Sequence, residues 1–194
     1  LEVYTAYDDV KDVMKLTEEI IQKTAQEVLG TLTVPFGDHT IDLARWQRIS
    51  FAKIMKDNFD INPEDHEKIW IEKMKKKHVN FESKSGQELS RTQLINIVGE
   101  MLEPGTNLSK EGCPIFVTDY FTELCPLAKK SKHNPFLSDR FELYIGGMEI
   151  ANGYSELNDP IDQRERLAQE LKAKGKESTF DSLDEDFILA LEHG

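Results

Sequence analysis

The stretch Glu142–Pro160, ELYIGGMEIANGYSELNDP, is the most informative about the fold, because a hairpin signal lies within strand-like sequence that also carries acids. Its glycine pair, Gly146 and Gly147, predicts a two-residue turn between antiparallel strands. That turn places Tyr144 opposite Glu149. The face formed in this way carries Glu142, Tyr144, Glu149 and Ala151.

Two acids on this face, Glu142 and Glu149, lie diagonally across from each other and need a positive partner if they are shielded from water. A hard divalent ion such as Mg2+, held by one or two carboxylates and by the phosphates of a substrate, is the candidate. The alternative is that both acids face water, because acidic side chains are mostly exposed in proteins. Spacing alone leaves both interpretations open.

A second polar row follows on the next strand. Asn152, Tyr154 and Glu156 are spaced two residues apart, so one strand face presents an amide, a phenol and a carboxylate. This row predicts a pocket for a polar ligand, with a solvated strand face as the alternative. An uninterrupted strand would put the row on the opposite face from Glu149. We therefore expect a bulge near Gly153 that joins the two sets.

The amino-terminal part of the chain predicts a strand and then a helix. Leu1–Tyr7 alternates like the end of a strand, with Glu2 and Tyr4 on the same face. Residues 9–29 have a helical stripe of apolar residues, and Gly30 follows as the expected cap. This period change is the clearest local signal outside the hairpin.

The remaining pattern predicts an α+β fold, an antiparallel sheet flanked by helices. The expected elements are a hairpin over 31–43, a helical insertion over 45–112, strands over 114–121, 139–147 and 148–157, and a helix from 160 onward. Trp46 and Trp70 are expected to be packing anchors within the insertion.

Composition excludes several classes of function. The net charge of −12 on 194 residues disfavours tight nucleic-acid binding by this piece alone, and the basic run at 73–78 is interpreted as a solvated helix face. Cys113 and Cys125 are expected to be reduced thiols, and no zinc spacing occurs. The sequence shows no membrane-spanning run and no secretory leader, which predicts a cytoplasmic protein. Both ends of the sequence suggest a fragment of a longer protein.

Three segments resemble the catalytic domain of bacterial-type class II lysyl-tRNA synthetases, between the second and third signature motifs of that family. They are LEVYTAYDDVKDVMKLTEEI at 1–20, PLAKKSKHNPFLSDRFELYIGGMEIANGYSELNDPIDQRERL at 126–167, and DEDFILALEHG at 184–194. The resemblance implies the antiparallel class II fold and an enzyme that activates lysine with ATP and transfers it to tRNA(Lys). It also implies bound Mg2+ and a homodimer in the cytoplasm.

The resemblance assigns roles to two groups of residues. Glu142 and Glu149 match the family's acids that hold Mg2+ against the ATP phosphates. The lysine pocket is implied to contain Glu2, Tyr4, Asn152, Tyr154 and Glu156. No residue of the chain is assigned as catalytic, because the family's arginines fall outside it, and the chain alone is expected to be inactive.

Two other functions remain as alternatives. One is the lysyl-tRNA synthetase paralogue that attaches lysine to elongation factor P, which shares the pocket. The other is a non-catalytic module that binds an amino acid or a metal. The roles of Lys129 and Lys130, where the family often carries basic residues, stay open, and none of the five histidines is assigned to catalysis.

Overall fold

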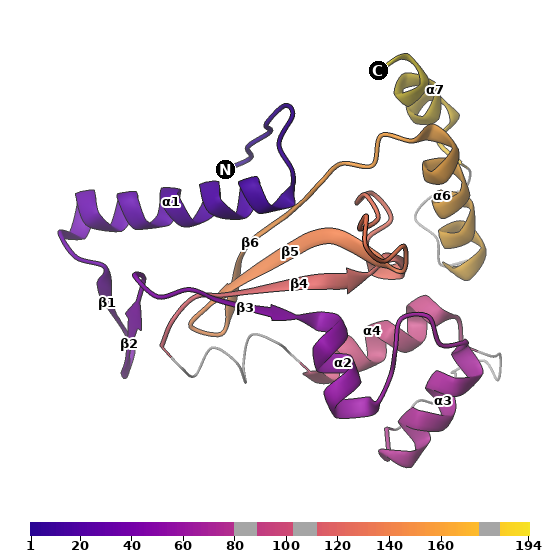
Figure 1. The fold of residues 1–194 in the computed structure, drawn as a ribbon, viewed down its shortest axis with the longest axis horizontal. Coiled ribbons are helices and arrows are strands. Elements are labelled where there is room, and N and C mark those ends of the chain that lie inside the picture. The colour runs from indigo at the N-terminus through magenta and orange to yellow at the C-terminus, as the bar shows by residue number, and fades with distance from the viewer. Residues whose placement is uncertain (80–88, 103–111, 175–182) are drawn as a thin grey trace.

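The computed structural model describes residues 1–79, 89–102, 112–174 and 183–194 (Figure 1). Its elements, in chain order, are α1 (Val10–Leu29), β1 (Thr33–Phe36), β2 (His39–Asp42), β3 (Gln47–Ser50), α2 (Phe51–Phe59), α3 (Glu67–Lys76), α4 (Arg91–Leu102), β4 (Ile115–Phe121), the short 3-10 helix η2 (Thr122–Leu124), β5 (Leu137–Ile145), β6 (Met148–Tyr154), α6 (Pro160–Lys174) and α7 (Glu185–His193). None of the helices described here is both long and apolar enough to cross a membrane.

A four-stranded sheet in the order β3-β4-β5-β6 is the centre of the molecule. The pairs β4–β5 and β5–β6 are antiparallel, whereas β3 runs parallel to β4. The α+β class with a sheet flanked by helices is therefore confirmed, with one parallel pair that the sequence pattern did not predict. The separate β1–β2 hairpin is also confirmed, and it turns at Gly37 as expected.

Helix α1 begins and ends where its capping residues require. The Asp9 carboxylate accepts hydrogen bonds from the backbone of the first turn, and the Asp9 backbone N–H donates to the Asp12 carboxylate, which forms a capping box. Gly30 ends the helix in the left-handed region, at φ 69°. The apolar face of α1 packs against β5 and β6, so this helix covers one face of the sheet.

The strand predicted over Leu1–Tyr7 is wrong. This segment is irregular and exposed, with Tyr4 79% exposed. A strand is stable only when its backbone groups pair with a neighbour, and no described strand pairs with this segment. The alternation of its side chains was therefore insufficient to make it a strand.

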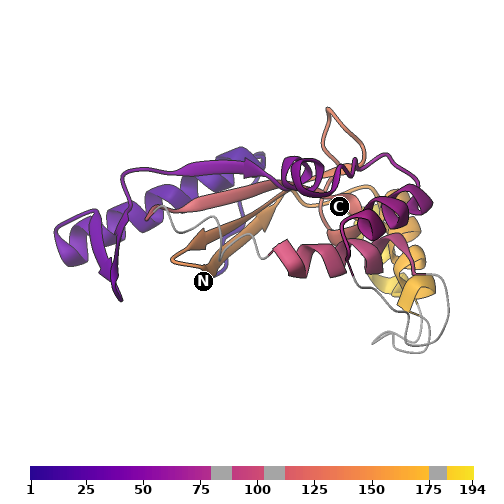
Figure 2. The ribbon, with the colours of Figure 1, turned by 90° about the horizontal axis from the view of Figure 1, so that it is seen from below.

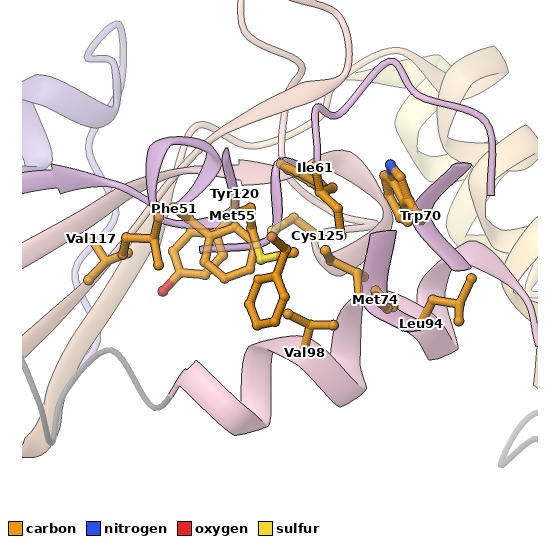
Figure 3. Close-up of a cluster of buried hydrophobic side chains, with 14 of the residues drawn as sticks. Phe51, Met55, Ile61, Trp70, Met74, Leu94, Val98, Val117, Tyr120 and Cys125 are labelled. Atoms are coloured by element: carbon orange, nitrogen blue, oxygen red, sulfur yellow. The ribbon is translucent and has the colours of Figure 1, made fainter. Parts of the chain in front are cut away.

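The described helices of 45–112 pack on the other face of the sheet. Ser50 caps α2 as expected, its hydroxyl accepting from the Lys53 N–H at 3.2 Å. Helices α2, α3 and α4 share one buried cluster with β4, which includes Trp70 and Met55 (Figure 3). The segment also contains β3, a strand of the central sheet that the helical pattern did not predict.

Trp46 does not belong to that helical cluster. Its ring stacks on Phe116 at 5.4 Å, among the residues under α1. Trp46 and Trp70 are therefore packing residues on opposite faces of the sheet. Seen from below, α1 and the β1–β2 hairpin lie toward one end of the molecule, and the helices α2, α3, α4, α6 and α7 lie toward the other (Figure 2).

Candidate functional site

The predicted hairpin turn is confirmed. Gly146 and Gly147 have φ angles of 59° and 82°, the left-handed values that a two-residue turn of this kind requires and that glycine adopts without strain. Tyr144 lies opposite Glu149, as the turn predicts. The turn thus fixes the first acid of β6 against the end of β5.

The predicted bulge is also confirmed, but it lies closer to the turn than Gly153. The register passes from Tyr144 opposite Glu149 to Leu143 opposite Ala151, so Ile150 is the extra residue. The expectation that Ala151 shares a face with Glu149 is therefore wrong. Ala151 packs instead with Leu143 in the cluster under α1, because the extra residue changes the alternation.

The bulge joins the two polar sets on one face of the sheet. Beyond it, Asn152 lies directly opposite Glu142, and Tyr154 lies opposite Arg140. The Asn152 Nδ2 group donates a hydrogen bond of 3.1 Å to Glu149 Oε1. The two acids proposed for a metal and Asn152, the first residue of the proposed lysine row, therefore lie on one face of the sheet, where a hydrogen bond joins Asn152 to Glu149.

The Glu142 carboxylate accepts three short hydrogen bonds. Tyr120 Oη and Tyr144 Oη each donate to Oε2 at 2.6 Å, and Arg140 Nη2 donates to Oε1 at 2.6 Å. The Glu142 side chain is 14% exposed. Burial of the two phenols, together with the nearby Glu142 charge, raises the pKa of both Tyr120 and Tyr144.

Arg140 supplies the positive charge that the acid needs at this depth. Besides Glu142, its guanidinium donates to the Leu124 carbonyl at 3.3 Å and to Cys125 Sγ at 3.2 Å. It also lies over the Tyr120 ring, 5.1 Å from the centroid. These contacts fix the guanidinium, so a protein group compensates the negative charge of Glu142. Glu142 also lines a cavity that a ligand could enter.

Tyr120 and Arg140 were not predicted as site residues. Arg140 lies two residues before Glu142, and Tyr144 lies two residues after it. This spacing puts all three side chains on one strand face, and it could have identified Arg140 as a site residue. Tyr120 lies beyond a register shift between β4 and β5 at Asp119, which has φ 56°. Without that irregularity, strand alternation would send Tyr120 to the face under α1.

The carboxylates of the site fit a hard divalent cation. Glu142 and Glu149 line one cavity of about 310 Å³, beneath residues of α2 and α4. Among the residues that the structure describes, no group of three or more His, Cys, Asp or Glu could hold a metal. Two carboxylates that line one cavity can hold Mg2+, which commonly takes its other ligands from substrate phosphates and water.

The lysine row is brought together in part. Burial raises the pKa of Tyr154, and the Glu156 carboxylate and then the Tyr4 phenol raise it further. Glu156 is exposed overall, yet desolvation raises the pKa of its carboxyl. Glu2 lies in the exposed segment before α1, and it makes no hydrogen bond or ion pair with the residues described here.

The two lysines left open by the sequence have different surroundings. Lys130 Nζ donates to Asp162 Oδ1 at 2.8 Å and so connects its loop to α6. Lys129 lines a separate cavity of about 860 Å³ beside the start of α1. Neither side chain lines the cavity that contains Glu142 and Glu149.

Comparison with known proteins gives concordant matches. The family described as tRNA synthetases class II (D, K and N) matches residues 1–194. Lysine–tRNA ligase of Acinetobacter baylyi is 40% identical over 199 residues, that of Bacillus subtilis 38% over 197, and that of Shewanella amazonensis 40% over 205. Each alignment covers the whole of this chain but only 38–39% of the relative.

Proposed function

The chain belongs to the class II tRNA synthetases (D, K and N), and on this premise we propose that the longer protein carrying it activates L-lysine with ATP and transfers it to tRNA(Lys). The observation that carries the proposal is the bulge at Ile150, which joins Glu149 to Asn152 on one face of the sheet. A metal-binding pair and an amino-acid pocket then adjoin each other, as activation of an amino acid by ATP requires.

The lysine pocket rests on charge complementarity. An ammonium group that loses its water must regain charge-assisted hydrogen bonds from carboxylates and from polar oxygens. Glu156 supplies the carboxylate and Tyr154 the phenol. Glu2, Tyr4 and Asn152 complete the proposed pocket. The raised pKa of Glu156 supports this role, because the cause of the shift is partial desolvation of its carboxylate.

The metal carboxylates are Glu142 and Glu149. When bound, Mg2+ would neutralise charge on the ATP phosphates, a contribution that positions and stabilises phosphoryl chemistry. The task of this chain is to orient the two carboxylates toward one cavity. Arg140 and the phenols hold Glu142 in place while that cavity remains open to a ligand.

The proposal extends to the partners of the longer protein. These are lysine, ATP, tRNA(Lys) and a second copy in a homodimer, in the cytoplasm. Residues 45–112 are proposed to be a helical insertion within the family's catalytic domain, and their described helices cover the candidate site on one side.

Glu156→Gln in the full-length protein tests the lysine pocket. One charge-assisted contact and the alignment it provides are lost, so we expect the lysine KM to rise and kcat/KM to fall by roughly one to three orders of magnitude. ATP–pyrophosphate exchange measures both constants. Glu27→Gln, an exposed acid on α1, is the matched control. A Glu156→Gln enzyme with wild-type constants rules this residue out of the pocket.

A further inference from the structure

Three hydrogen-bond donors hold the Glu142 carboxylate in place. A carboxylate has about four lone-pair positions. Tyr120 and Tyr144 occupy both positions on Oε2, and Arg140 occupies one on Oε1. The single open position therefore belongs to Oε1, which restricts Glu142 to one contact with a cation.

The Tyr120 phenol is the most constrained of these donors. Its side chain is only 4% exposed. Its ring stacks on Phe51 of α2, with centroids 4.9 Å apart and an interplanar angle of 17°. The Arg140 guanidinium covers the ring from another direction. Tyr120 therefore cannot turn away from Glu142 without disturbing α2 and β5 together.

Tyr144 differs from Tyr120 in its setting. It lies on the same strand as Glu142 and is only partly buried. Its bond to Oε2 has the same length, but nothing stacks on its ring among the aromatic pairs of the described residues. The two phenols thus share one acceptor atom, and the buried one determines where that atom lies.

We propose that Tyr120 is a positioning residue that fixes the Glu142 carboxylate, so that Oε1 faces the cavity shared with Glu149 and takes a divalent cation through one oxygen. This rests on the metal role given to Glu142 under the proposed function. The α2 helix takes part indirectly, because Phe51 holds the Tyr120 ring. The helical layer and the metal carboxylate are therefore connected by one stacked ring and one hydrogen bond.

The test compares Tyr120→Phe, Glu142→Gln and the control Tyr7→Phe in the full-length protein. Tyr7 is exposed and lies outside the cavity that contains Glu142. Two quantities are measured: the free Mg2+ that half-saturates ATP–pyrophosphate exchange, and the dissociation constant of Mn2+ from the protein–ATP complex, by water-proton relaxation. Circular dichroism melts establish that each variant is folded.

Loss of one hydrogen bond to a charged group predicts that Tyr120→Phe raises both metal constants by about 10- to 150-fold, with the lysine KM changed less than about twofold. Tyr7→Phe should match wild type. If Glu142→Gln shifts the metal constants but Tyr120→Phe does not, the positioning role is wrong and the metal role stands. If neither variant shifts them, the metal role of Glu142 is wrong as well. Equal losses of metal and lysine affinity in Tyr120→Phe would show a merely structural role and overturn the proposal.

Discussion

Glu142 and Glu156 are both acids of the candidate site, but their surroundings differ. Glu142 receives an arginine and two phenols, so its charge is compensated before any ligand arrives. Desolvation raises the pKa of Glu156, and no cationic side chain among the described residues lowers it. Glu156, whose charge is not compensated by a cationic side chain among the described residues, is thus the acid that is proposed to bind the lysine ammonium.

This difference predicts a pH dependence for lysine binding. The ordinary pKa of a glutamate is 4.5, and that of Glu156 is raised above it. As pH falls through this raised pKa, the carboxylate takes up a proton and the ammonium loses its partner, so the lysine KM should rise. The profile is measured by ATP–pyrophosphate exchange between pH 7 and the onset of acid unfolding. Glu156→Gln should remove the dependence, and a flat wild-type profile would contradict the prediction.

Among the secondary-structure elements, α6 is connected to the loop before β5 by the hydrogen bonds of one buried arginine. Arg166, 9% exposed, donates to the carbonyls of Cys125 at 3.2 Å and Ala128 at 2.7 Å, and pairs with Asp162 at 2.9 Å. The pairing with Arg166, and then with Lys130, lowers the pKa of Asp162. These hydrogen bonds matter for the site because Ala128 forms an antiparallel β-bridge with Glu156.

Arg166→Met should therefore destabilise the chain. Two carbonyls and one carboxylate lose their donor, which predicts a loss of about 2–3 kcal/mol in the free energy of unfolding. Urea denaturation followed by circular dichroism measures it. Arg164→Met is the matched control, two residues away on the same helix, because Arg164 is exposed and pairs with Glu185 at the surface. Equal destabilisation by the two substitutions would show that burial of Arg166 is not the cause.

At the scale of the whole molecule, the sheet is shared by two buried clusters. Strand β4 sends Phe116 toward α1 and its neighbours Ile115 and Val117 toward the helical layer. Because β4 contributes residues to both clusters, unfolding of β4 would expose both of them. The fold is therefore expected to unfold as one unit, although its helices lie in separate layers.

The two tryptophans allow a direct test, because Trp46 lies in one cluster and Trp70 packs on Phe121 in the other. Single-tryptophan variants, Trp46→Phe and Trp70→Phe, report on one face each. Their fluorescence midpoints in urea should each coincide with the circular dichroism midpoint of the same variant, as two-state unfolding requires. A cluster that melts separately from the secondary structure would contradict the shared-sheet interpretation.

The local features of this protein follow from its sequence. The Gly146–Gly147 pair determined the hairpin and its register, and Asp9 with Gly30 determined the ends of α1. Alternation also placed Glu142 and Glu149 on one face. Each of these depends on neighbours within a few residues, where turn geometry, capping and strand period act directly.

Features that depend on partners distant in the sequence could be learned only from the folded structure. The register shift at Asp119 places Tyr120 beside Glu142, and such a shift is set by how β4 pairs with β5. Leu1–Tyr7 has the pattern of a strand but no described partner, so it remains irregular. Strand pairing joins segments far apart in the chain, and the free energy that selects a register comes from that pairing and from packing, which no local pattern contains.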